Sequence, residues 1–250
     1  MEKLEILIVE DKKNHLADAK EFFSERENIV NVAYATNLQE AENQLNQTNY
    51  GAVISDIFFP TGLNKKENQI KVNGLYQRLK EVINELKEEA SNYLGYVNAP
   101  KEWLEGRTEA PCGIYVVEKA KEKKIPVVFN TDAFHHSDFL ESVFRWAKLN
   151  EIGFVDVMGE GNPKEWKKAY VNCIAEIENI KNINFLDLKR LENSKSKLEK
   201  KKKEYPKLIQ KASDENNMSY KKFYLEEMKE FPEIEKELKK CRKVIEKYKI

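Results

Sequence analysis

Acidic side chains stand directly after two of the most apolar segments of the chain. Residues 4–9 (LEILIV) precede Glu10 and Asp11, and residues 50–55 (YGAVIS) precede Asp56. Short apolar runs rich in β-branched residues indicate buried strands, and parallel strands bring their carboxyl ends to one edge of a sheet. Three carboxylates gathered there repel one another unless a cation neutralises them or a proton is retained. Hard oxygen ligands of this kind suit Mg²⁺.

Asp56 also has a purely structural interpretation, because Pro60 and Gly62 follow it and an aspartate before such residues often caps a turn. A third apolar segment, residues 125–130 (IPVVFN), runs into Thr131, whose hydroxyl can donate to a phosphoryl oxygen. The order strand–Glu–Asp, strand–Asp, strand–Thr favours a phosphate-handling site over a simple cap.

These segments, in this order and with helices between them, resemble the receiver domain of bacterial and archaeal response regulators over about residues 1–180. The similar pieces are ILIVED (6–11), SDIFFP (55–60), a helix start at Gly113, IPVVFNTD (125–132) and GFVDVMG (153–159). The resemblance implies an α/β fold of the flavodoxin-like type. Its five-stranded parallel sheet has the order 2-1-3-4-5 and carries helices on both faces.

The same resemblance implies a role for each site residue. Asp56 is the expected phospho-acceptor, and Thr131 is expected to contact the phosphoryl group. Glu10, Asp11, Asp56 and the backbone carbonyl of Phe58 are the expected Mg²⁺ ligands. The implied function is phosphorelay signalling by a protein that is not itself an enzyme, with a histidine kinase or another phosphodonor protein as its partner.

The sequence departs from the receiver pattern after the fifth strand. Glu160 stands where receivers place a lysine, and Val157 replaces the usual aromatic switch residue. Lys164, four residues beyond Glu160, is the candidate to reach back with the missing positive charge. His135 and His136 lie in the loop after Thr131, where an imidazolium could partly replace that charge.

About fifty residues, 61–112, interrupt the pattern after the Asp56 segment. Residues 110–124 are expected to form the third helix, because they lead directly into IPVVFN. Residues 73–82 are an alternative for that helix, inside an amphipathic stretch over 74–94. The additional helix would enlarge the core, cover the site or meet a partner.

Residues 181–250 carry no strand signal and are expected to form an all-α extension after the receiver-like domain 1–180. One helix is expected to end near Pro206, and Ser219 is expected to cap another. Apolar residues then recur with 4-3-4-3 spacing, at Ile234, Leu238, Cys241, Ile245 and Tyr248. This stripe predicts a helical hairpin or short coiled coil, and with it a homodimer.

Composition excludes several other classes of protein. Lys+Arg and Asp+Glu are equal at 43 each, but residues 181–250 hold 21 basic and 13 acidic side chains, so the front part is acidic. The mixing of Lys and Glu in this extension is typical of a solvated helix face, and no nucleic-acid-binding motif is recognisable.

The three cysteines form no metal-binding or disulfide pattern. With no signal peptide or apolar span, a cytoplasmic protein without membrane contact is expected.

In the favoured interpretation, a phosphorelay receiver, the output is protein–protein interaction of the helical tail. Two other functions compete with it. One is a pseudo-receiver that keeps the fold as an interaction platform without phosphotransfer. The other is a Mg²⁺-dependent phosphohydrolase with Asp56 as its nucleophile. The second is disfavoured, because hydrolases of the haloacid-dehalogenase type need an aspartate two residues after the nucleophile, where this chain has Phe58.

Overall fold

A computed structural model describes residues 2–63, 111–132, 150–156 and 163–250, together with isolated positions at 67, 70, 73, 74, 77, 143, 144 and 146–148. Most of the insertion therefore lies outside the described residues, including nearly all of the helix expected over 74–94. His135, His136, Val157 and Glu160 lie outside them as well. Among the helices that are described, none has both the length and the apolar character needed to cross a membrane.

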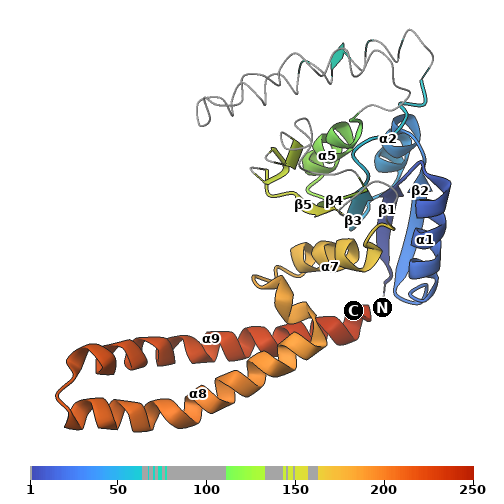
Figure 1. The fold of residues 1–250 in the computed structure, drawn as a ribbon. Coiled ribbons are helices and arrows are strands. Elements are labelled where there is room, and N and C mark those ends of the chain that lie inside the picture. Colours follow the sequence, from blue (N-terminus) through green and yellow to red (C-terminus); the bar gives the residue numbers. More distant parts are fainter. Residues whose placement is uncertain are drawn as a thin grey trace. The chain divides into compact units, whose positions relative to one another are not determined.

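Five parallel strands form one sheet in the order β2-β1-β3-β4-β5 (Figure 1). Every neighbouring pair runs parallel, and the predicted flavodoxin-like α/β class is confirmed. The strands are β1 Leu4–Val9, β2 Val30–Ala35, β3 Ala52–Ser55, β4 Val127–Thr131 and β5 Gly153–Asp156.

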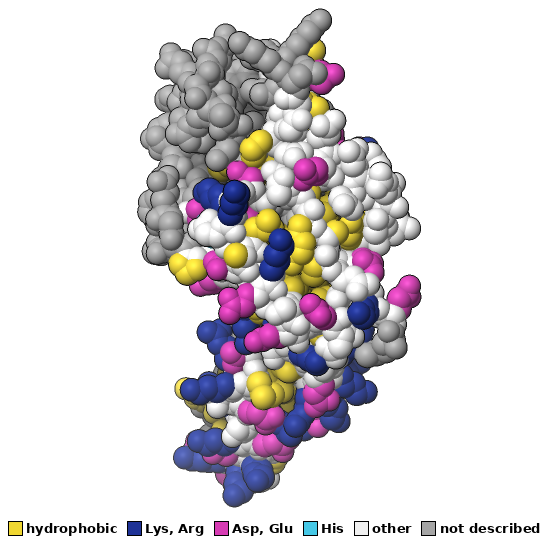
Figure 2. Space-filling view, turned by 90° about the vertical axis from the view of Figure 1, so that its right-hand side faces the viewer, with side chains coloured by type: hydrophobic (Ala, Val, Ile, Leu, Met, Phe, Trp, Pro, Cys, Tyr) yellow, Lys and Arg dark blue, Asp and Glu magenta, His cyan; other side chains and the backbone are white. Residues whose placement is uncertain are grey.

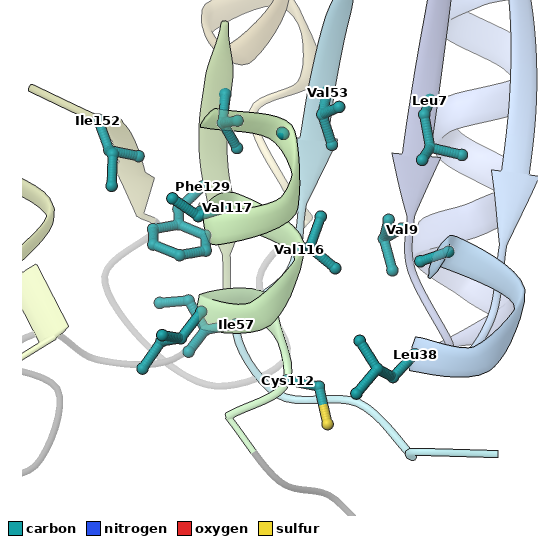
Figure 3. Packing of buried hydrophobic residues seen from close by; sticks show 14 of the residues in the cluster. Leu7, Val9, Leu38, Val53, Ile57, Cys112, Val116, Val117, Phe129 and Ile152 are labelled. Atoms are coloured by element: carbon teal, nitrogen blue, oxygen red, sulfur yellow. The ribbon is translucent and has the colours of Figure 1, made fainter. Parts of the chain in front are cut away.

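The helices described in full beside this sheet are α1 Lys13–Ser24, α2 Leu38–Gln47, α5 Gly113–Glu122 and α7 Trp166–Ile177. The helices α2 and α5 pack over one face, where they share a core with strand residues such as Leu7, Val53 and Phe129 (Figure 3). The helices α1 and α7 meet each other through the rings of Phe23 and Tyr170, whose centroids are 5.7 Å apart.

Side-chain alternation along the strands decides which residues face which helices. Val9 and Phe129 belong to the core under α2 and α5, so the residues next to them point to the opposite face. Ile8 and Val128 are fully buried there. Both faces of the sheet are therefore covered, as the continuous apolar runs in the sequence predict.

The start of α5 lies against the backbone that carries Asp56. The amide of Gly113 donates to the carbonyl of Ile57 at 3.0 Å. A Cβ atom at position 113 would lie 2.5 Å from the Asp56 carbonyl oxygen and 2.9 Å from the Ile57 Cα. Only glycine permits this approach, and α5 occupies the place between β3 and β4 expected of the segment 110–124.

The chain divides into two compact units, Met1–Cys173 and Ile174–Ile250. The second unit contains a short 3₁₀ helix, Ile183–Leu186, and two long helices, α8 Leu188–Asp214 and α9 Met218–Tyr248. These two helices pack along each other as a hairpin. This is the all-α extension that the sequence predicts.

The prediction that a helix ends near Pro206 is wrong, because α8 continues through this residue to Asp214. Pro206 is exposed, while its neighbour Tyr205 is buried against the rings of Tyr224 and Phe231 at 5.0 and 5.5 Å. Tertiary packing therefore holds the helix across a residue that lacks an N–H group.

The cap of α9 also differs from the prediction. Asn217, rather than Ser219, is the N-cap residue, and its side chain accepts a hydrogen bond from the Tyr220 amide at 3.3 Å. Ser219 already lies inside the helix. An asparagine side chain serves the cap as well as serine does, so the sequence alone could not separate the two positions.

The apolar stripe of α9 is buried within this unit. Leu238, Cys241, Ile245 and Tyr248 are all buried, and Ile234 is half-buried. The facing residues on α8 recur every seven positions at Leu191, Leu198, Tyr205 and Ala212. A homodimer stays a prediction, and since this stripe already has a partner in the same chain, the dimer would need a different surface.

Replacing Gly113 by alanine should destabilise the sheet unit by about 1–3 kcal/mol, because the added methyl group meets rigid backbone atoms. Gly51→Ala is the matched control. There the one close contact is with the Cδ1 end of the Leu4 side chain, which can rotate away, while the nearest backbone atom lies at an ordinary 3.6 Å. Urea unfolding of both variants measures the difference, and an equal loss in both would show that α5 can shift freely.

Candidate functional site

The acids predicted to gather at the sheet edge do so. Glu10 follows β1 and Asp56 follows β3, and the amide of Asp56 donates to the carbonyl of Val9 at 2.9 Å, which continues the ladder between the two strands. One carboxylate oxygen each from Glu10, Asp11 and Asp56 lies within 4.8 Å of the others. This donor set is suited to hold a divalent cation.

The side chain of Lys164 lies between two of these acids. Its Nζ is 2.5 Å from Oε2 of Glu10 and 2.8 Å from Oδ2 of Asp56, and the side chains of all three residues are at most 2 % exposed. Lys164 precedes α7 by two residues. The start of a helix, rather than the end of the fifth strand, thus delivers the positive charge.

The charges of this cluster do not balance when every group is ionised. Burial lowers the pKa of Lys164, but the charges of Asp56 and Glu10 more than offset this and raise the pKa, so the ammonium stays charged. Burial raises the pKa of Glu10 to about 7, although Lys164 counteracts it. Three carboxylates against one ammonium leave room for a proton on Glu10 or for a bound cation.

Asp56 serves the turn and the charge cluster at the same time. Its Oδ1 accepts a hydrogen bond from the Ile57 amide at 2.7 Å, while its Oδ2 pairs with Lys164. The capping interpretation and the site interpretation are therefore not exclusive. The hydrogen bond holds the carboxylate in one orientation at the end of β3.

Asn130 lies at the level of Asp56 on the neighbouring strand. Ser55 pairs with Phe129 in the β3–β4 register, so the next residues along both strands stand side by side and point to the same face. Asn130 is 1 % exposed, and neither its side-chain nitrogen nor its oxygen has a hydrogen-bond partner in the part of the chain that the structure describes. Because an unpaired buried amide costs about 1–3 kcal/mol, this position is suited to a polar ligand.

A second ionic contact lies at the end of β4. The Asp132 carboxylate accepts hydrogen bonds from Lys12 Nζ at 2.7 and 3.0 Å, and His15 Nε2 lies 3.2 Å from its Oδ2. Burial raises the pKa of Asp132, but the hydrogen bond from Lys12 and the charge of Lys164 outweigh it, so the pKa is lowered. This contact ties the start of α1 to the same sheet edge.

The remaining predicted ligands are placed near the cluster by the fold. Thr131 is the last residue of β4 and is fully buried. Phe58 follows Asp56 by two residues, and its side chain belongs to the hydrophobic core. Contact of Thr131 with a phosphoryl group and metal ligation by the Phe58 carbonyl stay predictions.

Sequence reasoning missed Asn130, Asp132, Lys12 and His15 as members of this edge. One signal was available for Asn130, since a buried amide at the end of the apolar run IPVVFN is expected to have a hydrogen-bond partner or a ligand. The contacts of Asp132 join residues 117 and 120 positions apart, so no local pattern reveals them.

Comparison with known proteins adds no relative, because no protein-family model matches this chain and no curated protein is significantly similar to it. The fold and the acid cluster at the strand ends therefore define the class: a flavodoxin-like domain with a receiver-like acidic pocket.

Removing the buried cation should destabilise the domain strongly. Lys164→Met leaves Glu10 and Asp56 facing each other, at an expected cost of about 3–5 kcal/mol, because one partner of a buried ionic cluster is lost. Lys167→Met, at an exposed position of α7, is the control and should cost little. Added divalent cation should recover part of the loss in the first variant. Urea unfolding with and without the cation checks both points.

Divalent-cation affinity should depend on pH through Glu10. A ligand carboxylate must be ionised, and its pKa of about 7 means that a proton competes with the cation below neutrality. Affinity measured by calorimetry should fall by up to about tenfold per pH unit below that value, as for one competing proton. Glu10→Gln should remove this dependence, and a wild-type affinity that is constant from about pH 8 to about pH 6 would contradict the assignment.

Proposed function

We propose that this chain is an atypical response-regulator receiver, with Asp56 as the phospho-accepting residue and Mg²⁺ as the cation. The observation that carries the proposal is the buried Lys164 ammonium against Asp56 and Glu10, at the carboxyl edge of a flavodoxin-like sheet. It supports the proposal because the charge that Glu160 fails to supply reaches Asp56 from another element.

In the proposed reaction an Asp56 carboxylate oxygen attacks the phosphorus of the donor. The new O–P bond gives an acyl phosphate, and the bond between phosphorus and the donor breaks, with its electron pair leaving on the donor. Lys164 would shift from Asp56 toward the phosphoryl oxygens, and the Thr131 hydroxyl would donate to one of them. Glu10, Asp11, Asp56 and the Phe58 carbonyl would hold Mg²⁺, which supplies positive charge against the transferring group.

The donor in this proposal is a histidine kinase or another phosphodonor protein, and the chain is a substrate of phosphotransfer rather than an enzyme. Its output would be protein–protein interaction of the helical hairpin. The donor follows from the resemblance of ILIVED, SDIFFP and IPVVFNTD to receiver segments, and the output is assigned to the all-α extension that follows them.

A phosphorylation-independent pseudo-receiver is the second candidate, and one observation favours it. Lys164 already neutralises part of the acid cluster from within the chain, without a metal or a phosphoryl group. A phosphohydrolase receives no such support, because position 58 carries a core phenylalanine.

Phosphotransfer should be detectable with a small-molecule donor such as acetyl phosphate. With Mg²⁺ the wild-type chain should gain the mass of one phosphoryl group, in a form that hydroxylamine removes. Asp56→Asn should abolish the gain, while Asp214→Asn, at an exposed hairpin position, should leave it unchanged. A folded, Mg²⁺-binding wild type that gains no phosphoryl group would favour the pseudo-receiver.

A further inference from the structure

The two helices of the hairpin differ in charge. Helix α8 carries ten Lys and Arg against four Asp and Glu, whereas α9 carries nine against seven. Figure 2 shows one face of the molecule, on which Lys and Arg side chains crowd the hairpin with Asp and Glu among them. The excess of positive charge in this unit therefore belongs mainly to α8.

Some lysines of α8 hold the two helices together. Lys201 Nζ lies 3.0 Å from Glu227 Oε2, and Lys202 Nζ lies 2.7 Å from Glu235 Oε2, both across the helix pair. Glu192 of α8 accepts from Arg242 of α9 at 3.3 Å. These charges on the flanks of the contact have a structural role.

Other lysines of α8 stand on the opposite side of the helix. The buried residues of α8 recur every seven positions from Leu191 to Ala212, so positions two residues before or after them face away from α9. From residue 189 to residue 207 these outward positions are all exposed and contain no acid. We call them, together with Lys211, the lysine row. Lys211 follows Lys207 by four residues and stands on the flank of the helix, one residue before the buried Ala212. The members are Lys189, Asn193, Ser196, Lys200, Lys203, Lys207 and Lys211.

The lysine row does not stabilise the hairpin. Lys200, Lys203, Lys207 and Lys211 follow one another at spacings of three and four residues, where like charges destabilise a helix. The acids nearest to them are only loosely paired, since Lys200–Glu204 and Lys211–Glu215 are both 3.8 Å apart. A solvated helix face normally alternates its charges, so a row of like charges at these spacings points to an anionic partner.

We propose that the lysine row binds the phosphate backbone of double-stranded nucleic acid. At 1.5 Å per residue the row from Lys189 to Lys211 is about 33 Å long, close to one turn of a DNA duplex. Lys, Asn and Ser are among the side chains that contact phosphate oxygens, and contacts to the backbone carry no sequence information, so binding through them is independent of sequence. The row has no large apolar side chain that could enter a lipid bilayer, which a membrane-surface helix requires.

Fluorescence anisotropy of a labelled DNA duplex of about 30 base pairs, with the full chain as titrant, tests this proposal, since it measures affinity against salt concentration. The test variant is Lys200→Gln/Lys207→Gln. The control is Lys229→Gln/Lys236→Gln, which removes the same charge at the same spacing from exposed positions of α9. Glutamine forms helices nearly as well as lysine, and far-UV circular dichroism checks that both variants keep their helices.

The wild type should bind two unrelated duplex sequences equally well. The test variant should lose about tenfold or more in affinity at low salt, and its salt dependence should fall by about two released counterions. The control should keep the wild-type salt dependence. Three outcomes would overturn the proposal. The wild type binds no duplex, or both variants lose the same affinity for it. In the third, the test variant keeps its duplex affinity and loses binding only to anionic lipid vesicles or to an acidic protein, such as a second copy of this chain. None of these results depends on phosphorylation of Asp56.

Discussion

The unit Met1–Cys173, which contains the sheet, depends on the contact of the buried Lys164 ammonium with two carboxylates. Two carboxylates at the ends of adjacent strands, Glu10 and Asp56, are out of contact with water, and burial of such groups is unfavourable unless a cation meets them. The fold supplies that cation from a third element, just before α7. With Asp11 beside them, three carboxylates meet one ammonium, and this excess of negative charge gives the edge its capacity for a proton or a metal ion.

Much of this edge could be predicted, because its signals are local. The apolar runs LEILIV and IPVVFN identify strands, and the acids directly after LEILIV and AVIS must then lie at the carboxyl edge. The contacts of Lys164 and Asp132 could not be predicted with the same certainty, since they join residues more than 100 positions apart. The continuation of α8 through Pro206 could not be predicted for a related reason. Burial of the neighbouring Tyr205 ring outweighs the low helix propensity of proline.

The second unit shows how one helix can carry two kinds of lysine. Composition alone indicates a solvated mixture of charges, because it cannot tell which side chains face α9. The heptad spacing of the buried residues makes the distinction: Lys201 and Lys202 pair across the hairpin, while Lys200 and Lys207 face outward in an acid-free row. The apolar stripe of α9, which suggested a dimer, is occupied by its own chain, so the outer faces are what this unit offers to partners.

The most direct measurement is a crystal structure of the chain with Mg²⁺ and beryllofluoride, a mimic of the phosphoryl group. The account predicts beryllofluoride bound to the Asp56 carboxylate, a metal ion among the acids Glu10, Asp11 and Asp56, and the Lys164 ammonium moved from Asp56 to a fluorine atom. Crystals that contain both reagents but show Asp56 unmodified and Lys164 still paired with it and with Glu10 would contradict the account.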